Sequence, residues 1–211
     1  MLSGGLTIGK VLGFPVQVGY SAVLIALWIG WTFGGGQLAN AAVFSAVMFG
    51  SILVHELGHA VVGKRLGLRP TGIVLHGFGG LCTYGRAPDA KQGVLSAAAG
   101  PGAGLLLGLV GLAIQVAVGG MLPSQVNWML GWIIQINLFW SLFNLVPLYP
   151  LDGGHVLWHA LRMYLPGGKA WRITRWVGFV TGGLIIVAGL LTGQFFLVIV
   201  AGMSIANLLE R

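Results

Sequence analysis

The stretch SILVHELGHAVVGKR, residues 51–65, ends a long apolar run with two histidines and a glutamate. No charged residue occurs from Ala41 to Val54, so these ionisable side chains follow a segment that is suited to lipid. A charge at the centre of a membrane helix costs on the order of 3 kcal/mol, and such residues usually mark a functional site. The motif therefore raises the question of which fold and which other residues accompany it.

The composition indicates a membrane protein. Of 211 residues, 56% are hydrophobic and only 7% are charged, whereas about a quarter of a soluble domain is charged. Apolar blocks of about 20 residues, the length needed to cross a bilayer, recur along the chain. Because they recur to its end, the first block, near Val18, is not interpreted as a cleaved signal peptide. The single cysteine, Cys82, excludes an internal disulfide and a cysteine metal cluster.

We expect an all-α polytopic membrane protein with six transmembrane helices, over residues 18–33, 41–63, 92–119, 127–146, 176–191 and 195–209. All eleven Lys and Arg residues then fall on one side of the membrane. The positive-inside rule makes that side cytoplasmic and predicts that both termini are cytoplasmic in a multi-pass protein of the cell membrane. The net charge of +7 is thus a topology signal, and no nucleic-acid partner is expected. A re-entrant pair remains an alternative for the last two segments, which only TGQ separates.

Residues 71–86, TGIVLHGFGGLCTYGR, predict a small β-hairpin or sheet between the second and third helices. Two short runs that contain β-branched or aromatic residues flank Gly-Phe-Gly-Gly, which is typical of a hairpin. Open sheet edges are not tolerated against lipid, so the element must be membrane-associated, at the interface or enclosed by helices. A shielded edge of this kind could accept another peptide as an added strand.

The histidines predict a metal site. His55 and His59 are four residues apart on one helix, so both imidazoles project from the same face. With Glu56 they match the His-Glu-x-x-His pattern, in which the histidines bind zinc and the glutamate acts as general base. The alternative is that these polar side chains only reach toward the nearby interface, but ionisable residues in membranes are rarely without a function.

A catalytic zinc has three protein ligands and one open position. Glu56 and Asp152 are the two of four acidic residues that lie at or within apolar spans, so Asp152 is the candidate third ligand. It lies in NLVPLYPLDGG, residues 144–154, where Pro147 and Pro150 interrupt the fourth helix. His155 and His159 are also four residues apart, but they lack the acidic residue of the pattern. We interpret them as interfacial histidines, with a second-shell role open for His155, and leave the role of His76 open.

The motif HELGH, followed later by N-x-x-P-x-x-P-L-D-G-G, resembles the site-2 protease family of intramembrane zinc metalloproteases. GLTIGKVLGFPVQVGY, HGFGG and AAAGPGAG are similar to further segments of that family, although relatives often have an asparagine soon after the last of these. The resemblance implies a single intramembrane metalloprotease domain over residues 1–211, a minimal core without a PDZ or C-terminal sensing domain. It implies one Zn²⁺ per chain, held by His55, His59 and Asp152. Glu56 would activate the water, and Asn144 would orient the substrate or stabilise the oxyanion.

The expected function is that of a zinc-dependent intramembrane endopeptidase, with its active site within the membrane toward the cytoplasmic side. It would hydrolyse a peptide bond in or near the transmembrane segment of a membrane-tethered substrate, in regulated intramembrane proteolysis. By resemblance, that substrate is an anti-sigma factor, a membrane-bound transcription-factor precursor or a remnant signal peptide. The alternatives are an ion or small-solute transporter, because intramembrane acids and histidines also form ion relays, and an inactive scaffold that binds membrane helices. A transporter is disfavoured by the lack of an internal repeat with paired broken helices.

Overall fold

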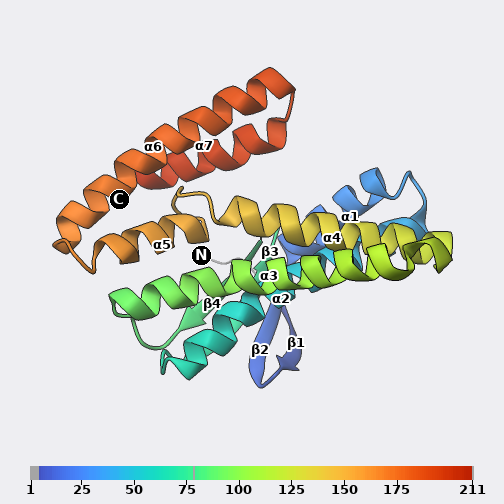
Figure 1. The fold of residues 1–211 in the computed structure, drawn as a ribbon, viewed down its shortest axis with the longest axis horizontal. Coiled ribbons are helices and arrows are strands. Elements are labelled where there is room, and N and C mark those ends of the chain that lie inside the picture. The colour runs from blue at the N-terminus through green and yellow to red at the C-terminus, as the bar shows by residue number, and fades with distance from the viewer. Residues whose placement is uncertain (1–4, 78, 211) are drawn as a thin grey trace. The chain divides into compact units, whose positions relative to one another are not determined.

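The computed structural model describes residues 5–77 and 79–210. In chain order the elements are β1 (Gly5–Val11), β2 (Phe14–Gly19), α1 (Tyr20–Phe33), α2 (Leu38–Arg65), β3 (Pro70–His76), β4 (Gly79–Tyr84), α3 (Ala90–Val118), the short helical turn η1 (Gly119–Met121), α4 (Ser124–Asn144), α5 (Asp152–Leu161), α6 (Gly167–Thr192) and α7 (Phe195–Leu209) (Figure 1). The chain divides into two compact units. The first unit comprises Met1–Ala87 and Ala99–Ser141, and the second comprises Pro88–Ala98 and Leu142–Arg211.

Each of the six segments predicted to span the membrane contains a helix, namely α1, α2, α3, α4, α6 and α7. Four of the described helices, α2, α3 with the following turn, α4 and α6, are long and apolar enough to cross a membrane. The helices α1 and α7 are apolar but shorter, with 14 and 15 residues. The membrane class is therefore confirmed with four candidate spans, and the six-span arrangement stays a prediction.

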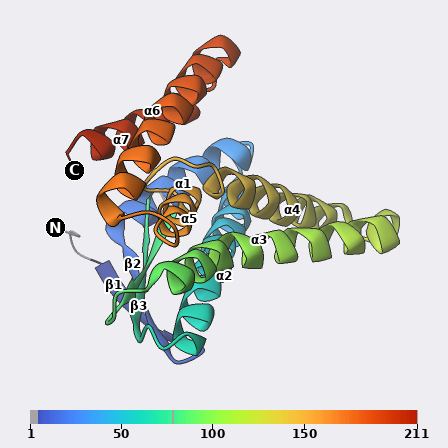
Figure 2. The same ribbon diagram turned by 60° about the vertical axis from the view of Figure 1, so that its left-hand side comes forward.

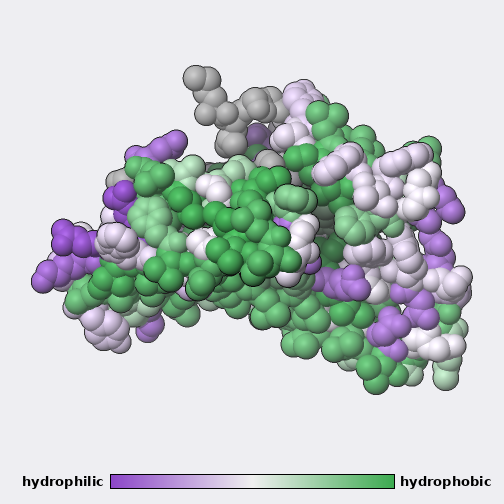
Figure 3. Space-filling model, turned by 90° about the horizontal axis from the view of Figure 1, so that it is seen from above, coloured by the Kyte–Doolittle hydropathy of each residue, from purple (hydrophilic) through white to green (hydrophobic). Residues whose placement is uncertain are grey.

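The exposed surface is strongly hydrophobic, as expected of a protein surrounded by lipid. Hydrophobic residues make up much of the face seen in Figure 3, and hydrophilic residues lie on it in smaller groups. Large side chains such as Trp28, Leu106 and Leu184 expose 71%, 65% and 65% of their surface. In water this much exposed apolar area would promote aggregation, whereas in a bilayer it contacts acyl chains.

A four-stranded sheet in the order β1-β2-β3-β4 belongs to the first unit (Figures 1 and 2). The pairs β1–β2 and β3–β4 are antiparallel, and β2 and β3 are parallel. Successive side chains of a strand point to opposite faces of the sheet. Every second residue of the two central strands therefore packs on α2. The buried members of this core are Phe14, Val16, Ile73 and Leu75 of the sheet with Ile52 and Ala60 of α2.

Sequence reasoning predicted the β3–β4 pair, but the predicted fold class needs an addition. The structure has two further strands before α1, and β2 joins the sheet beside β3. As a result β3 is a central strand and β4 is an edge strand. This edge lies next to the helix that carries the histidine motif.

Glycines allow helices within each unit to approach closely. In the first unit, Gly104 and Gly108 of α3 face Ser141 and Leu138 of α4, as small-residue repeats do in membrane helix pairs. Pro101 lies inside α3, and the helix continues through it rather than beginning there. In the second unit, α6 and α7 lie side by side in both ribbon views (Figures 1 and 2), and α6 is capped by Gly193, whose φ of 70° suits a glycine.

Candidate metal centre

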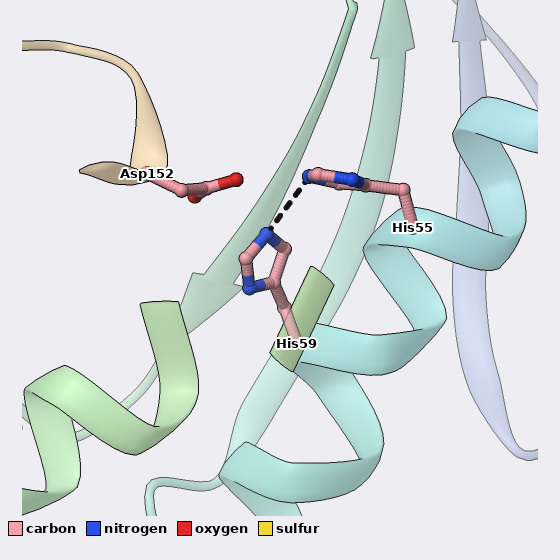
Figure 4. A group of neighbouring side chains, drawn as sticks. All are labelled: His55, His59 and Asp152. Carbon is pink, nitrogen blue, oxygen red and sulfur yellow. Dashed lines mark hydrogen bonds between the residues drawn. The ribbon is translucent and has the colours of Figure 1, made fainter. Parts of the chain in front are cut away.

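His55 and His59 bring two ring nitrogens together on one face of α2. Their Nε2 atoms are 3.2 Å apart and their ring planes are inclined by 77° (Figure 4). Two imidazoles on one tetrahedral zinc, with Zn–N distances of about 2.0–2.1 Å, have their nitrogens about 3.3 Å apart. A hydrogen bond between neutral rings would give a similar separation. The geometry therefore fits two ligands of one metal ion as well as a hydrogen bond between the rings.

The helix face that carries the motif is buried. His55, Glu56 and His59 expose only 4%, 4% and 8% of their surface. Leaving an ionisable group in such a place is costly unless it is paired or binds a metal. Three such groups within five consecutive residues are therefore expected to have a function in common.

The backbone of α3 forms one wall of the histidine pair. A Cβ atom added at Gly100 would overlap Nε2 and Cε1 of His59 and would lie 2.7 Å from Nε2 of His55. Only glycine fits at this position without moving a ring. The spacing of Gly100, Gly104 and Gly108 is typical of helix-packing glycines, but in the structure Gly100 faces the histidines.

The side chain of Glu56 lies against the edge strand. A Cβ atom at Gly80 of β4 would overlap Cγ of Glu56 and would approach its Oε1 atom to 2.5 Å. The carboxylate is therefore held between α2 and the backbone of β4, beside the metal-ligand candidates. It also acts on Cys82 of the same strand: burial first, and then the charge of Glu56, raise the pKa of the Cys82 thiol to about 11, although a hydrogen bond with Tyr84 opposes them.

Two hydrogen bonds and one ring contact support the motif helix, and sequence reasoning did not predict them. The Tyr84 hydroxyl donates to the carbonyl of His59 at 3.1 Å, and its ring packs where a Cβ at Gly63 would lie. One turn before His55, Ser51 accepts a hydrogen bond from the Asn137 amide of α4 at 2.8 Å. The sequence signals available were the buried asparagine in an apolar helix and the glycines of HGFGG and AAAGPGAG.

The second unit carries the other two predicted site residues. Asp152 is the first residue of α5, and Asn144 is the buried last residue of α4. Between them the chain turns tightly, because added Cβ atoms at Gly153 and Gly154 would overlap the carbonyls of Leu145 and Val146 and the backbone of Tyr149. Asp152 offers a carboxylate oxygen, a donor type that zinc accepts as a ligand.

His159 is buried within the second unit, and its predicted place at the membrane interface stays a prediction. It is 5% exposed and packs where the backbone of α3 lacks a side chain, at Gly93. Burial first, and then the charges of His155 and Arg162, lower its pKa to about 4 against the opposing effect of Asp89. It is therefore neutral at neutral pH. The His155 ring lies 4.5 Å from that of Tyr149, and its second-shell role stays a prediction.

Comparison with known proteins identifies relatives among zinc metalloproteases. No protein-family model matches the chain. Rip3 of Mycobacterium tuberculosis, named provisionally as a zinc metalloprotease, is 31% identical over 215 residues, which cover 91% of this chain and 54% of Rip3. The zinc metalloprotease MJ0392 of Methanocaldococcus jannaschii is 29% identical over 199 residues, covering 91% and 56%. The chain spans about half the length of the curated relatives it matches.

A solved structure shares the fold. The site-2 protease from Methanocaldococcus jannaschii superposes with a TM-score of 0.71 over 98% of this chain and 94% of that one, at 24% identity. The likeness extends over nearly the whole of both chains. This likeness establishes the fold. The candidate metal ligands come from the buried histidine motif of α2.

Proposed function

We propose that this chain is a member of the site-2 protease family and a zinc-dependent endopeptidase that cleaves membrane-tethered proteins in or near a transmembrane segment. The observation that carries the proposal is the pair of Nε2 atoms 3.2 Å apart in α2, with the buried Glu56 beside it. All residues that the reaction requires are present in the sequence, which disfavours an inactive scaffold. No observation favours transport.

The proposed ligands are His55, His59 and Asp152, with one zinc ion per chain. Two imidazoles and one carboxylate are a set that catalytic zinc uses, with a fourth position left for water or substrate. Bound zinc supplies a Lewis acid that polarises the scissile carbonyl and lowers the pKa of water toward about 7. The position of Gly100 supports the two histidines as ligands. Its missing side chain leaves space for the two Nε2 atoms to approach each other, and a Cβ atom would fill that space.

Glu56 is the proposed general base. It accepts a proton from the attacking water and later donates it to the amine of the leaving segment. Its burial against Gly80 of β4 keeps the carboxylate away from bulk solvent. Asn144 is proposed to orient the substrate or to donate a hydrogen bond to the oxyanion.

The edge strand β4 is the proposed docking site for the substrate. A helical segment hides its carbonyls in internal hydrogen bonds, so it must become extended before attack. An extended peptide can pair with an open edge, and β4 is the edge whose Gly80 contacts Glu56. We expect cleavage near Gly, Pro or Asn, which loosen the substrate helix.

The proposed topology has six spans, with the basic segments and both termini in the cytoplasm. Lys64 and Arg65 make the last turn of α2 basic. The site is therefore expected within the membrane, toward the cytoplasmic face. The proposed role is regulated intramembrane proteolysis. An anti-sigma factor, a membrane-bound transcription-factor precursor or a remnant signal peptide would be the substrate.

The proposal is tested with a tagged single-span substrate in neutral detergent. Wild type should cleave it, a chelator should stop cleavage, and added zinc should restore it. Glu56→Gln should keep its zinc and lose about 10²–10⁴-fold in rate, the usual contribution of a general base. Glu210→Gln, the same change at an exposed helix end, is the matched control and should cleave as wild type does. Full activity of Glu56→Gln would remove Glu56 from the mechanism.

A further inference from the structure

The second unit has a groove that the proposed reaction does not use. It has a volume of about 540 Å³ and runs along one face of α6 to the end of α7. Its lining residues on α6 lie three or four positions apart, from Gly168 to Phe179, as residues on one helix face do. A rise of 1.5 Å per residue makes this face about 16 Å long.

One part of the groove is cationic. Arg172 is exposed, and Arg175 is half-buried one turn further along. The Nε atom of Arg175 is buried and has no hydrogen-bond partner among the described residues. Glu210 follows the lining residue Leu209 in sequence, but its side chain is exposed and does not line the groove.

The other part is aromatic and apolar. The guanidinium of Arg175 lies 5.5 Å from the centre of the Phe179 ring, and the ring of Trp176 lies 5.9 Å from the same ring. Trp176 and Leu209 are 66% and 63% exposed. Tryptophan is enriched where membrane helices meet the headgroup layer. The cationic and apolar parts of the groove therefore adjoin at the depth where the phosphate of a lipid adjoins its acyl chains.

We propose that this groove binds an anionic phospholipid. The guanidinium groups of Arg172 and Arg175 take the phosphate, for which arginine offers a planar set of donors, and Trp176, Phe179 and Leu209 contact the acyl chains. Charge complementarity selects an anionic headgroup over a zwitterionic one. The apolar half selects a lipid over free phosphate, which has nothing to place there. The proposal is independent of the proteolytic function.

Native mass spectrometry of the delipidated full chain in neutral detergent tests this site. The protein is offered equal amounts of dioleoyl-phosphatidylglycerol and dioleoyl-phosphatidylcholine. Wild type should retain phosphatidylglycerol preferentially. Arg175→Gln should weaken that retention about fivefold, and Arg175→Lys should restore only part of it, since lysine keeps the charge but lacks the planar set of donors. The control Lys169→Gln removes the same charge from α6 outside the groove and should retain the lipid as wild type does.

Three outcomes overturn the proposal. They are unchanged retention in Arg175→Gln, equal retention of the two lipids by wild type, and complete displacement of phosphatidylglycerol by millimolar inorganic phosphate. The last would make free phosphate the ligand. Thermal unfolding checks that each variant is folded. If Arg175→Gln unfolds, Arg172→Gln, whose side chain is exposed, takes its place with the same expected loss.

Discussion

Replacing Gly100 by alanine should weaken zinc binding without changing any ligand. The added Cβ would lie 2.7 Å from Nε2 of His55 and would overlap the ring of His59. Ordinary contacts with a Cβ begin at 3.4 Å, so the His55 ring would have to retreat by about 0.7 Å. Metal-ligand distances tolerate only about 0.2 Å. We therefore expect zinc affinity to fall by about 10–100-fold, the range seen when groups that orient metal ligands are changed.

The assay measures zinc per chain by elemental analysis and zinc affinity by competition with a chromophoric chelator in detergent. Gly102→Ala is the matched control, because a Cβ there meets nothing within 4 Å. That variant should keep wild-type zinc affinity, and its helix should be slightly more stable, since alanine is favoured over glycine in a helix interior by about 0.5–1 kcal/mol. Circular dichroism shows whether both variants keep their helices.

The competing explanation is a hydrogen bond between two neutral histidines with no metal. In that case Gly100→Ala would lower stability but would change no zinc affinity, because there would be none to lose. Wild-type zinc affinity in a folded Gly100→Ala protein would refute the packing of the two rings against α3.

Three further predictions concern the surroundings of the motif. Gly80→Ala should lower the proteolytic rate at unchanged zinc content, because its Cβ would displace Glu56 from β4. Ser51→Ala should lower the free energy of unfolding by about 0.6 kcal/mol, as expected for one interhelical hydrogen bond in a membrane protein, since it removes one of the two acceptors of the Asn137 amide. Cys82, whose pKa is raised to about 11, should react slowly with maleimide at pH 7 and about tenfold faster for each pH unit above it, because the thiolate is the nucleophile.

Each of these has its own control. Gly72→Ala also adds a methyl group to the sheet, but its Cβ would make only an ordinary contact, 3.5 Å from the carbonyl of Pro15, so its proteolytic rate should equal that of wild type. If Ser51→Ala unfolds in denaturant as wild type does, the hydrogen bond contributes nothing. A free cysteine peptide gives the reference reaction rate for the thiol, and an equal rate for Cys82 at pH 7 would contradict the raised pKa.

The sequence predicts the motif helix and the other long helices because both depend on local signals. Apolar length decides where a helix such as α3 or α6 forms, and a spacing of four places His55 and His59 on one face. The predicted hairpin at residues 71–86 also needed only neighbouring residues, and β3 and β4 form there.

Long-range pairing is the feature that the sequence did not predict. The parallel pairing of Val16 with Ile73 joins segments separated by two helices, and no periodicity in either strand specifies its partner. The helix α5 was missed because Pro147 and Pro150 indicate a break in the fourth helix but do not predict a new helix after the break. Its ten residues are also too few for a span.

Glycine was the hardest residue to interpret, and at the metal centre it is also the most informative. Gly80 and Gly100 come from different elements, β4 and α3, and each brings backbone against a side chain of the same motif. A wall made of backbone cannot change rotamer, so it fixes the positions of Glu56 and the two imidazoles more tightly than side chains could. Because no side chain separates this backbone from the motif, one added methyl group would contact Glu56 or the imidazoles directly. We therefore expect a substitution of Gly100 to lower zinc affinity as much as a substitution of a group that orients the ligands does.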